Sequence, residues 1–391
     1  MSKLKELIDK LCPDGVEYKK LGEVCHILDA QRKPISKSKR IKGIYPYYGA
    51  NGIQDYVSDY IFDGTFLLVG EDGSVINKDN SPVLNWAVGK IWVNNHAHIL
   101  TAKDSNNLRY IYYALQIQDV SKIVRGVPPK INQESLKSIR IPLPHIEVQE
   151  EIVRILDNFT KCTAELQAEL QAREKQYEYY RNKLLSFEGR TDVEYKKLGE
   201  VCEFIKDGTH GSYNNVEDGY PLLSAKDINN GVISIPQDCR RISKEDYDSI
   251  YKKYKLLKGD VLITIVGSIG RTAIVGDGIE VAFQRSVGIL RPLNIVLSSY
   301  LFYALQTSSS QKKLAARTSK SAQGGVYLGE LSKIEIPIPT LTEQQRIVDI
   351  LDRFDTLVND ISQGLPAEIE ARQNQYEYYR DRLLSFKRLT T

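Results

Sequence analysis

Two short stretches at equivalent positions carry residue types that can read the edges of nucleic-acid bases. At an offset of 190 residues, Asn94, Asn95 and His96 align with Gln284, Arg285 and Ser286. Amide and guanidinium groups can form two hydrogen bonds at once with an adenine or a guanine edge in the major groove. We therefore treat these residues as candidates for base contact. A turn with solvated polar side chains is the competing interpretation.

A loop near the end of each copy is rich in cations. Residues 122–130 correspond to residues 317–325 at an offset of 195, which aligns Lys122 with Arg317, Arg125 with Lys320, and Lys130 with Gly325. Lysine and arginine interleaved with glycine suit contact with backbone phosphates, which position a nucleic acid without reporting its sequence. We expect these loops to contact phosphates, although a solvated basic loop would have the same composition.

The chain lacks the motifs of a nucleotide-dependent enzyme. It has no Gly-x-x-x-x-Gly-Lys-Ser/Thr phosphate loop and no Gly-x-Gly-x-x-Gly after a strand. Residues 127–130 lack the Asn or Asp that opens an adenine methyltransferase Pro-Pro motif, and residues 267–272 imitate a phosphate loop with the wrong spacing. His96 and His98 would share one strand face, but no third metal ligand accompanies them. We expect no catalytic residue, cofactor or metal in this chain.

These candidates belong to a chain with an internal repeat. Val16–Cys25 returns letter for letter as Val193–Cys202, and Ala172–Arg181 returns almost unchanged as Ala371–Arg380. A repeat this long is a duplicated domain rather than a solenoid. The offset grows from 177 to 199 along the chain, and the residues between the shared phrases are nearly unrelated. The sequence thus predicts two similar frames that carry two different inserts.

Charge is divided unevenly between the inserts and the segments that follow them. Residues 26–140 carry a net charge of +5 and residues 203–335 a net charge of +3, whereas residues 141–189 and 336–391 carry −3 and −2. Lysine and arginine supply most non-specific affinity for nucleic acids by neutralising phosphates. We expect an anionic polymer to contact the inserts and to avoid the acidic segments. Ordinary scatter of surface charge would also produce differences of this size.

The acidic segments have the pattern of long helices. Residues 146–187 contain no Pro or Gly, and their seam positions alternate in steps of four and three, which predicts a coiled coil. The second copy has four extra residues, Gln363–Pro366, and we expect a kink or a short break there because Gly and Pro interrupt helices. Two such helices can pair antiparallel. Short β-branched runs bounded by Gly, Asp or Asn indicate that the inserts are compact α/β domains.

Composition limits the class of protein. Of 391 residues, 42% are apolar and 26% are charged, as in ordinary globular proteins. There is no apolar run near the roughly 20 residues of a membrane helix. There is also no signal peptide at the start, so we expect a cytoplasmic protein. The five cysteines include no close pair, which argues against a zinc site or a disulfide framework.

Together these features resemble the specificity subunit of type I restriction-modification enzymes. Each variable insert is followed by an Ile-Pro-Leu/Ile-Pro exit strand and by a long helix with a Gln-rich start. Residues 92–100 and 267–275 are similar to phrases that recur in the target-recognition domains of that family. Arg271, within the second phrase, is a further candidate DNA contact.

The resemblance implies an α+β fold with an internal repeat. Two similar target-recognition domains, residues 1–145 and 189–340, would be separated by long helices, residues 146–188 and 341–391, in an antiparallel coiled coil kinked near residues 364–366. It implies a bipartite double-stranded DNA target, modification subunits in two copies, and restriction subunits. S-adenosylmethionine, ATP and Mg would be held by those partner subunits. A self-contained nuclease or methyltransferase, a coiled-coil scaffold and an RNA-binding duplicate are the alternatives.

Overall fold

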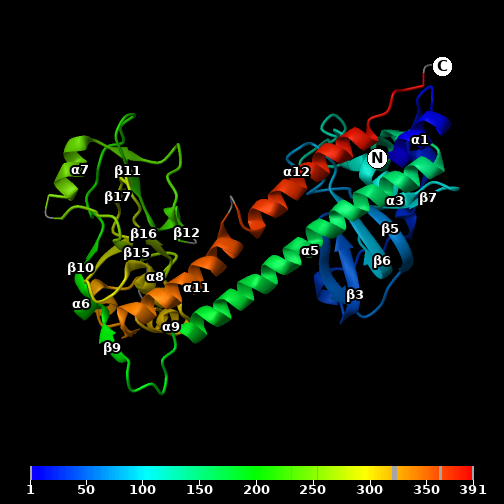
Figure 1. The fold of residues 1–391 in the computed structure, drawn as a ribbon. Helices are drawn as coiled ribbons and strands as arrows, with labels where there is room; N and C mark the ends of the chain where they lie inside the picture. The colour runs from blue at the N-terminus through cyan, green and yellow to red at the C-terminus, as the bar shows by residue number, and fades with distance from the viewer. Residues whose placement is uncertain (1, 230, 253, 319–323, 361–362, 390–391) are drawn as a thin grey trace. The chain divides into compact units, whose positions relative to one another are not determined.

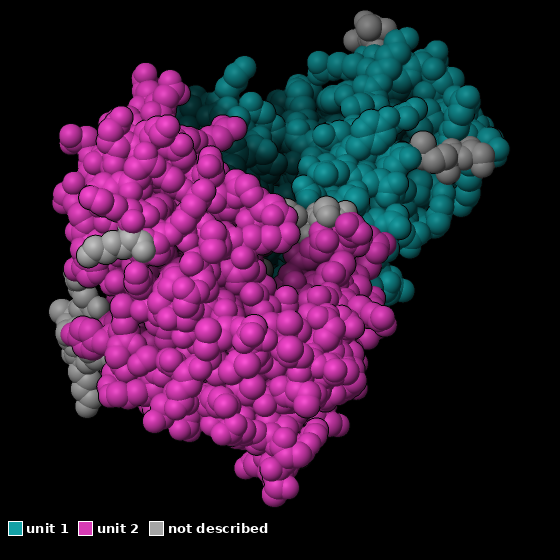
Figure 2. Space-filling view, turned by 60° about the vertical axis from the view of Figure 1, so that its left-hand side comes forward, with its two compact units in different colours: residues 1–165, 370–391 teal, residues 166–369 magenta. Residues whose placement is uncertain are grey.

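The computed structural model describes residues 2–229, 231–252, 254–318, 324–360 and 363–389. Contacts divide the chain into two compact units, residues 1–165 with 370–391 (unit 1) and residues 166–369 (unit 2), which Figure 2 colours separately. The divisions fall inside the long helical segments rather than at their ends. Each unit therefore contains one insert and parts of both helical segments.

Unit 1 is built on a six-stranded sheet of order β2-β7-β5-β6-β3-β4 (Figure 1). Its strands are β2 (Cys25–Ile27), β3 (Lys42–Gly49), β4 (Gly52–Val57), β5 (Phe62–Gly70), β6 (Leu84–Val93) and β7 (Ala97–Ala102). Successive residues of β5 enter different core clusters: Leu67 and Val69 join one, and Phe66 and Leu68 join the other. Since side chains alternate along a strand, both faces of this strand are covered.

The other elements of unit 1 surround this sheet and connect it to the long helices. They are α1 (Ser2–Leu11), β1 (Glu17–Lys20), α2 (Leu21–Val24), η1 (Asp29–Gln31), η2 (Lys37–Lys39), α3 (Leu108–Gln116), α4 (Gln133–Ser138), β8 (Arg140–Leu143), the first half of α5 (Ile146–Leu184) and most of α12 (Leu365–Leu384). Strands β1 and β8 pair antiparallel as a separate two-stranded sheet.

Unit 2 divides its strands among smaller sheets. A four-stranded sheet has the order β10-β18-β15-β16, a three-stranded sheet has the order β14-β11-β17, and β12-β13 and β19-β9 form pairs. The strands are β9 (Glu194–Lys197), β10 (Cys202–Asp207), β11 (Tyr220–Leu223), β12 (Ile228–Asn229), β13 (Val232–Ile233), β14 (Arg241–Ile242), β15 (Val261–Thr264), β16 (Thr272–Ile274), β17 (Ala282–Phe283), β18 (Val287–Pro292) and β19 (Glu335–Ile338). The helices are α6 (Leu198–Val201), η3 (Ala225–Asp227), α7 (Lys244–Ile250), α8 (Ser298–Gln306), α9 (Ser308–Ala316), α10 (Leu328–Leu331) and α11 (Leu341–Asn359).

The repeated phrases form the same frame in both units. Strand β1 pairs with β8 as β9 pairs with β19, and the hydroxyls of Tyr110 and Tyr300 donate to equivalent proline carbonyls at 2.9 Å. The glutamines at the two helix starts, Gln149 and Gln344, are both buried. Each accepts a hydrogen bond from the backbone N–H at the start of α3 or α8 and donates to the exit loop. These buried amides therefore fix each long helix to its insert.

The long helices pair antiparallel within each unit. In unit 1, Phe159 of α5 stacks on Tyr379 of α12, with ring centroids 5.5 Å apart. In unit 2, the hydroxyl of Tyr177 of α5 donates to Asp355 of α11 at 3.2 Å. Helix α5 is continuous over 39 residues, whereas its counterpart ends at Asn359 and resumes at Leu365. None of the helices in the described ranges combines the length and apolarity needed to cross a membrane.

The C-terminal segment completes the frame of unit 1. The N–H of Val16 donates to the carbonyl of Lys387, and the N–H of Leu389 donates to the carbonyl of Val16, both at 2.9 Å. The hydroxyl of Tyr18 donates to the carbonyl of Phe386 at 3.0 Å, and Leu384 is buried in the core of unit 1. In unit 2 the equivalent residues, 184–190, precede the frame directly in sequence. Unit 1 therefore closes with two segments from opposite ends of the chain.

Candidate nucleic-acid interface

In unit 1 the two predicted groups of contact residues lie on either side of Glu71 and Asp72, which follow β5. The N–H of Glu71 donates to the carbonyl of His96 at 2.8 Å. The ammonium of Lys130 lies 3.1 Å from the carboxylate of Glu71, and the Nδ1 of His96 contacts Asp72. Residues 94–96 and 122–130, which are distant in sequence, therefore share one rim of the domain.

A buried charge network supports this rim. His98 is fully buried, with Nδ1 2.6 Å from the carboxylate of Asp29 and Nε2 2.9 Å from the carbonyl of Ile131. Both ring nitrogens are therefore engaged, one by a carboxylate and the other by a backbone carbonyl. Burial alone would raise the pKa of Asp29, but the hydrogen bond and charge of His98 hold that pKa below its usual value. Arg32 contacts Glu71 and donates to the carbonyl of Ala97 at 2.9 Å.

The network contains a group of potential metal ligands. One donor atom each from Asp29, Glu71 and His98 lies within 4.8 Å of the others. Each of these residues already has a protein partner, and Arg32 and Lys130 supply positive charge beside Glu71. A cation would have to displace those side chains.

His96 precedes β7 and His98 lies within it, so the expectation that both imidazoles share a strand face was wrong.

Asn94 has the contacts of a turn residue. Its side chain is buried, its Nδ2 donates to Gln54 at 3.3 Å, and its Oδ1 accepts from the N–H of His96 at 2.8 Å. Both ends of the amide therefore have protein partners, one on β4 and one within the turn, and the side chain is buried rather than solvated. Asn95 is exposed and His96 is half-buried.

Within residues 122–130, residues 125–130 form a closed, exposed turn. The N–H of Arg125 donates to the carbonyl of Lys130 at 2.9 Å, and the N–H of Lys130 donates back at 2.7 Å. Lys122, Arg125 and Lys130 are all exposed. Three cations therefore flank a turn whose shape is fixed by reciprocal backbone hydrogen bonds.

In unit 2 the candidates occupy separate loops. Gln284 and Arg285 follow β17. The N–H of Gln284 donates to the carbonyl of Leu223 at 2.8 Å, and the N–H of Arg285 donates to the carbonyl of Thr209 at 3.0 Å. The side chain of Arg285 is exposed. Arg271 ends the turn between β15 and β16 and is also exposed. Its backbone N–H donates to the Thr264 hydroxyl at 2.9 Å, so this turn is a strand connection.

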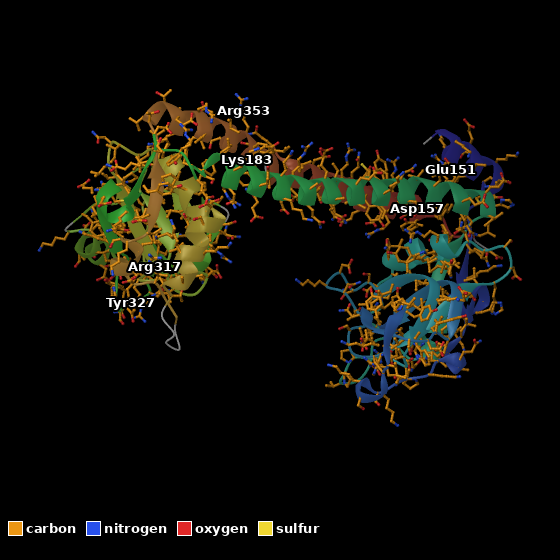
Figure 3. The ribbon with its side chains drawn as sticks, turned by 90° about the horizontal axis from the view of Figure 1, so that it is seen from below. Glu151, Asp157, Lys183, Arg317, Tyr327 and Arg353 are labelled. Carbon is orange, nitrogen blue, oxygen red and sulfur yellow. The ribbon has the colours of Figure 1, made fainter. Side chains whose placement is uncertain are left out.

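The cationic loop of unit 2 is described only in part. Arg317, labelled in Figure 3, follows α9, and its Nε lies 3.8 Å from the carboxylate of Glu330. Lys320 lies outside the described residues. The N–H of Val326 donates to the carbonyl of Ile265 at 2.9 Å, which brings the end of this loop beside the turn that carries Arg271. Within the described ranges, no hydrogen bond or ion pair joins Arg271 to Gln284 or to Arg317.

A family model described as "Type I restriction modification DNA specificity domain" matches residues 13–173 and 190–371. The chain belongs to this family. Each match covers one insert, its exit strand and most of the helical segment that follows, so the internal repeat is a duplicated specificity domain. Specificity subunits of type I systems are not catalytic, because catalysis resides in the partner subunits.

Two relatives match this specificity subunit along nearly its whole length. A putative type I restriction enzyme specificity subunit from Haemophilus influenzae is 39% identical, covering 99% of this chain and 100% of the relative. The EcoR124I/EcoR124II specificity subunit from Escherichia coli is 32% identical, covering 100% and 98%. The crystal structure of the type I S subunit from M. genitalium has a TM-score of 0.59 at 15% identity, covering 95% and 96%, and thus shares the fold. The predicted family and fold class are confirmed.

Sequence reasoning missed the residues beneath the rim. Asp29, Arg32 and Glu71 were not candidates, although they connect residues 94–96 to residues 122–130. Asp29 and Arg32 are three positions apart near the start of the insert, and a charged pair at that spacing is common on any helical turn. No signal in a single sequence distinguishes this pair from a solvated one.

Proposed function

We propose that this specificity subunit reads a bipartite double-stranded DNA target. The domain of residues 1–145 would read one half-site and the domain of residues 189–340 the other, with residues 146–188 and 341–391 setting the gap. It would direct adenine-N6 methylation and ATP-dependent cleavage by its partners. Two modification subunits and restriction subunits would hold S-adenosylmethionine, ATP and Mg. Such a complex would act where the cell keeps its DNA, in the cytoplasm.

The observation that carries this proposal is the duplicated specificity domain with two unrelated basic inserts. Similar frames would present each insert to DNA in the same manner, while the differences between inserts would give two different half-sites. The net charges of the inserts, +5 and +3, oppose those of the helical segments, −3 and −2. A polyanion is therefore favoured at the inserts.

Two kinds of contact are assigned within this proposal. Base edges would be read by Asn95 and His96 in the first domain and by Gln284 and Arg285 in the second, because their side chains lie on exposed or half-exposed loops. Phosphates would be bound by the cations Lys122, Arg125, Lys130, Arg271, Arg317 and Lys320. Asn94 is left out because its amide is buried and is engaged by Gln54 and by the backbone of His96.

Methylation mapping tests this function directly. Cells that express the modification subunits would be compared with and without this chain, and methylated adenines should appear in one split motif only when it is present. Exchanging residues 26–109 for another insert should change one half-site and preserve the other half-site and the gap. A change in both half-sites, or methylation independent of this chain, would contradict the proposal. Preference for unpaired RNA over duplex DNA would favour an RNA-binding role instead.

A further inference from the structure

The turn that carries the cations of unit 1 has an apolar tip. Val127 is fully exposed, and Pro128 and Pro129 beside it are also exposed. Gly126 precedes them with a φ of +82°, a conformation that favours glycine. Single exposed apolar side chains are common on proteins. A binding role for Val127 must therefore be argued from the backbone and the charges around it.

The tip is braced from below. Besides the reciprocal hydrogen bonds between Arg125 and Lys130, the N–H of Gly73 donates to the carbonyl of Pro129 at 2.9 Å. The N–H of Ile131 donates to the carbonyl of Glu71 at 2.9 Å, which ties the turn to the buried charge network. Two consecutive prolines further limit the backbone. A side chain presented on so constrained a turn loses little conformational entropy when it becomes buried in a partner.

The charges around the tip select the partner. Lys122, Arg125 and Lys130 lie on the two arms of the turn. Two carboxylates at its base are already paired, Glu71 with Arg32 and Lys130, and Asp72 with His96. An apolar point flanked by cations fits a polyanion that has apolar surface between its charges. Duplex DNA meets that description, because its bases lie between two lines of phosphates.

We propose that Val127 is a wedge that inserts into the DNA half-site read by the first domain and buries against base surface. This inference rests on the proposed function. Lys122 and Arg125 on one arm of the turn and Lys130 on the other would bind phosphates beside the insertion. Apolar wedges of this kind are known to unstack base steps. The base surface could be the face of an unstacked base or the methyl group of a thymine, which offer the same apolar chemistry. In the second domain the aligned position lies outside the described residues.

The test uses the full chain assembled with its modification subunits and duplexes that carry the mapped target. We expect Val127→Ser to weaken binding about tenfold, since burying most of a valine is worth at least that factor. Val127→Ile should bind like the wild type. Val88→Ser is the matched control, because Val88 is another exposed valine of the same domain, on β6, and it should leave affinity unchanged. Equal melting temperatures would establish that all variants fold.

Two sets of duplexes distinguish the sources of base surface. With 2-aminopurine placed along the half-site, insertion between bases gives a fluorescence rise at one step that Val127→Ser abolishes. In the second set, each thymine is replaced in turn by uracil, which lacks the methyl group. If Val127 contacts a thymine methyl group, the wild-type complex should bind one of these duplexes as weakly as the Val127→Ser complex binds the unmodified duplex. Either result supports the wedge.

Two results would overturn the wedge while leaving the proposed function intact. One is equal affinity of Val127→Ser and the wild type for the mapped target. The other is a loss confined to assembly with the modification subunits, which would make the tip a protein contact. By contrast, a wild-type complex that prefers no duplex sequence would refute the proposed function itself.

Discussion

Lengthening α5 by one turn should widen the gap between the two half-sites. Residues 164–167 and 168–171 have the same sequence, Ala-Glu-Leu-Gln, so a third copy extends an existing pattern. The insertion falls between the contact of Phe159 with Tyr379 and that of Tyr177 with Asp355, and both contacts can persist. The helical segment that pairs with α5 is already interrupted between α11 and α12. The change in length would be accommodated at that interruption.

The size of the change follows from helix geometry. Four residues add about 6 Å along the axis and about 40° of net rotation, because a helix rises ~1.5 Å per residue with ~3.6 residues per turn. One base pair adds about 3.4 Å and about 35°. For a helix lying along the duplex, the added length corresponds to one to two base pairs and the added rotation to about one. The gap should therefore grow by one to two base pairs, and the rotation favours one.

Methylation mapping in cells would measure this gap. Both half-sites should be unchanged, and only the number of unspecified bases between them should increase. Glu165→Gln is the control, since it alters the same exposed stretch at constant length and should leave the motif as it is. If complexes that contain the insertion variant methylate the original motif with the original gap, these helices do not set the spacing.

Two further predictions concern stability. Arg154 and Lys3 hold the pKa of the nearly buried Glu151 (Figure 3) at about 2, against an ordinary 4.5. Because that pKa is lowered on folding, the pair stabilises the protein fully above about pH 4.5 and loses its effect as pH falls toward 2. Glu151→Gln should cost about 1 kcal/mol at neutral pH, after allowance for the exposed cations; a urea-unfolding deficit that persists unchanged to pH 3 would contradict this. Arg291 donates two hydrogen bonds of 2.8 Å to buried Asp260, so Arg291→Ala should destabilise unit 2 by about 3 kcal/mol because it leaves a buried carboxylate unpaired. The double variant with Asp260→Asn should recover part of that loss, and urea unfolding that shows no recovery would count against the pairing argument.

The frame could be predicted from the sequence more fully than the arrangement of the candidate contact residues. Repetition located the exit strands and the Gln-rich helix starts, yet the role of Gln149 and Gln344 as buried links appears only once α3 and α8 are in place. Asn94 shows the limit at the surface, because its type suits base contact while its burial serves a turn. Glu71 and Lys130 meet across 59 positions, and no periodicity in one chain reports a contact at that separation.

The closure of unit 1 by residues 383–389 also fixes the order in which the protein can be completed. A ribosome delivers the first insert first, but the segment that pairs with Val16 arrives only after the whole second insert has been made. The second domain has its own residues 184–190 beside it from the start and can finish folding while synthesis continues. The domain at the beginning of the chain is therefore the last to be finished, and a nascent chain cut short within α12 would carry an open edge at Val16.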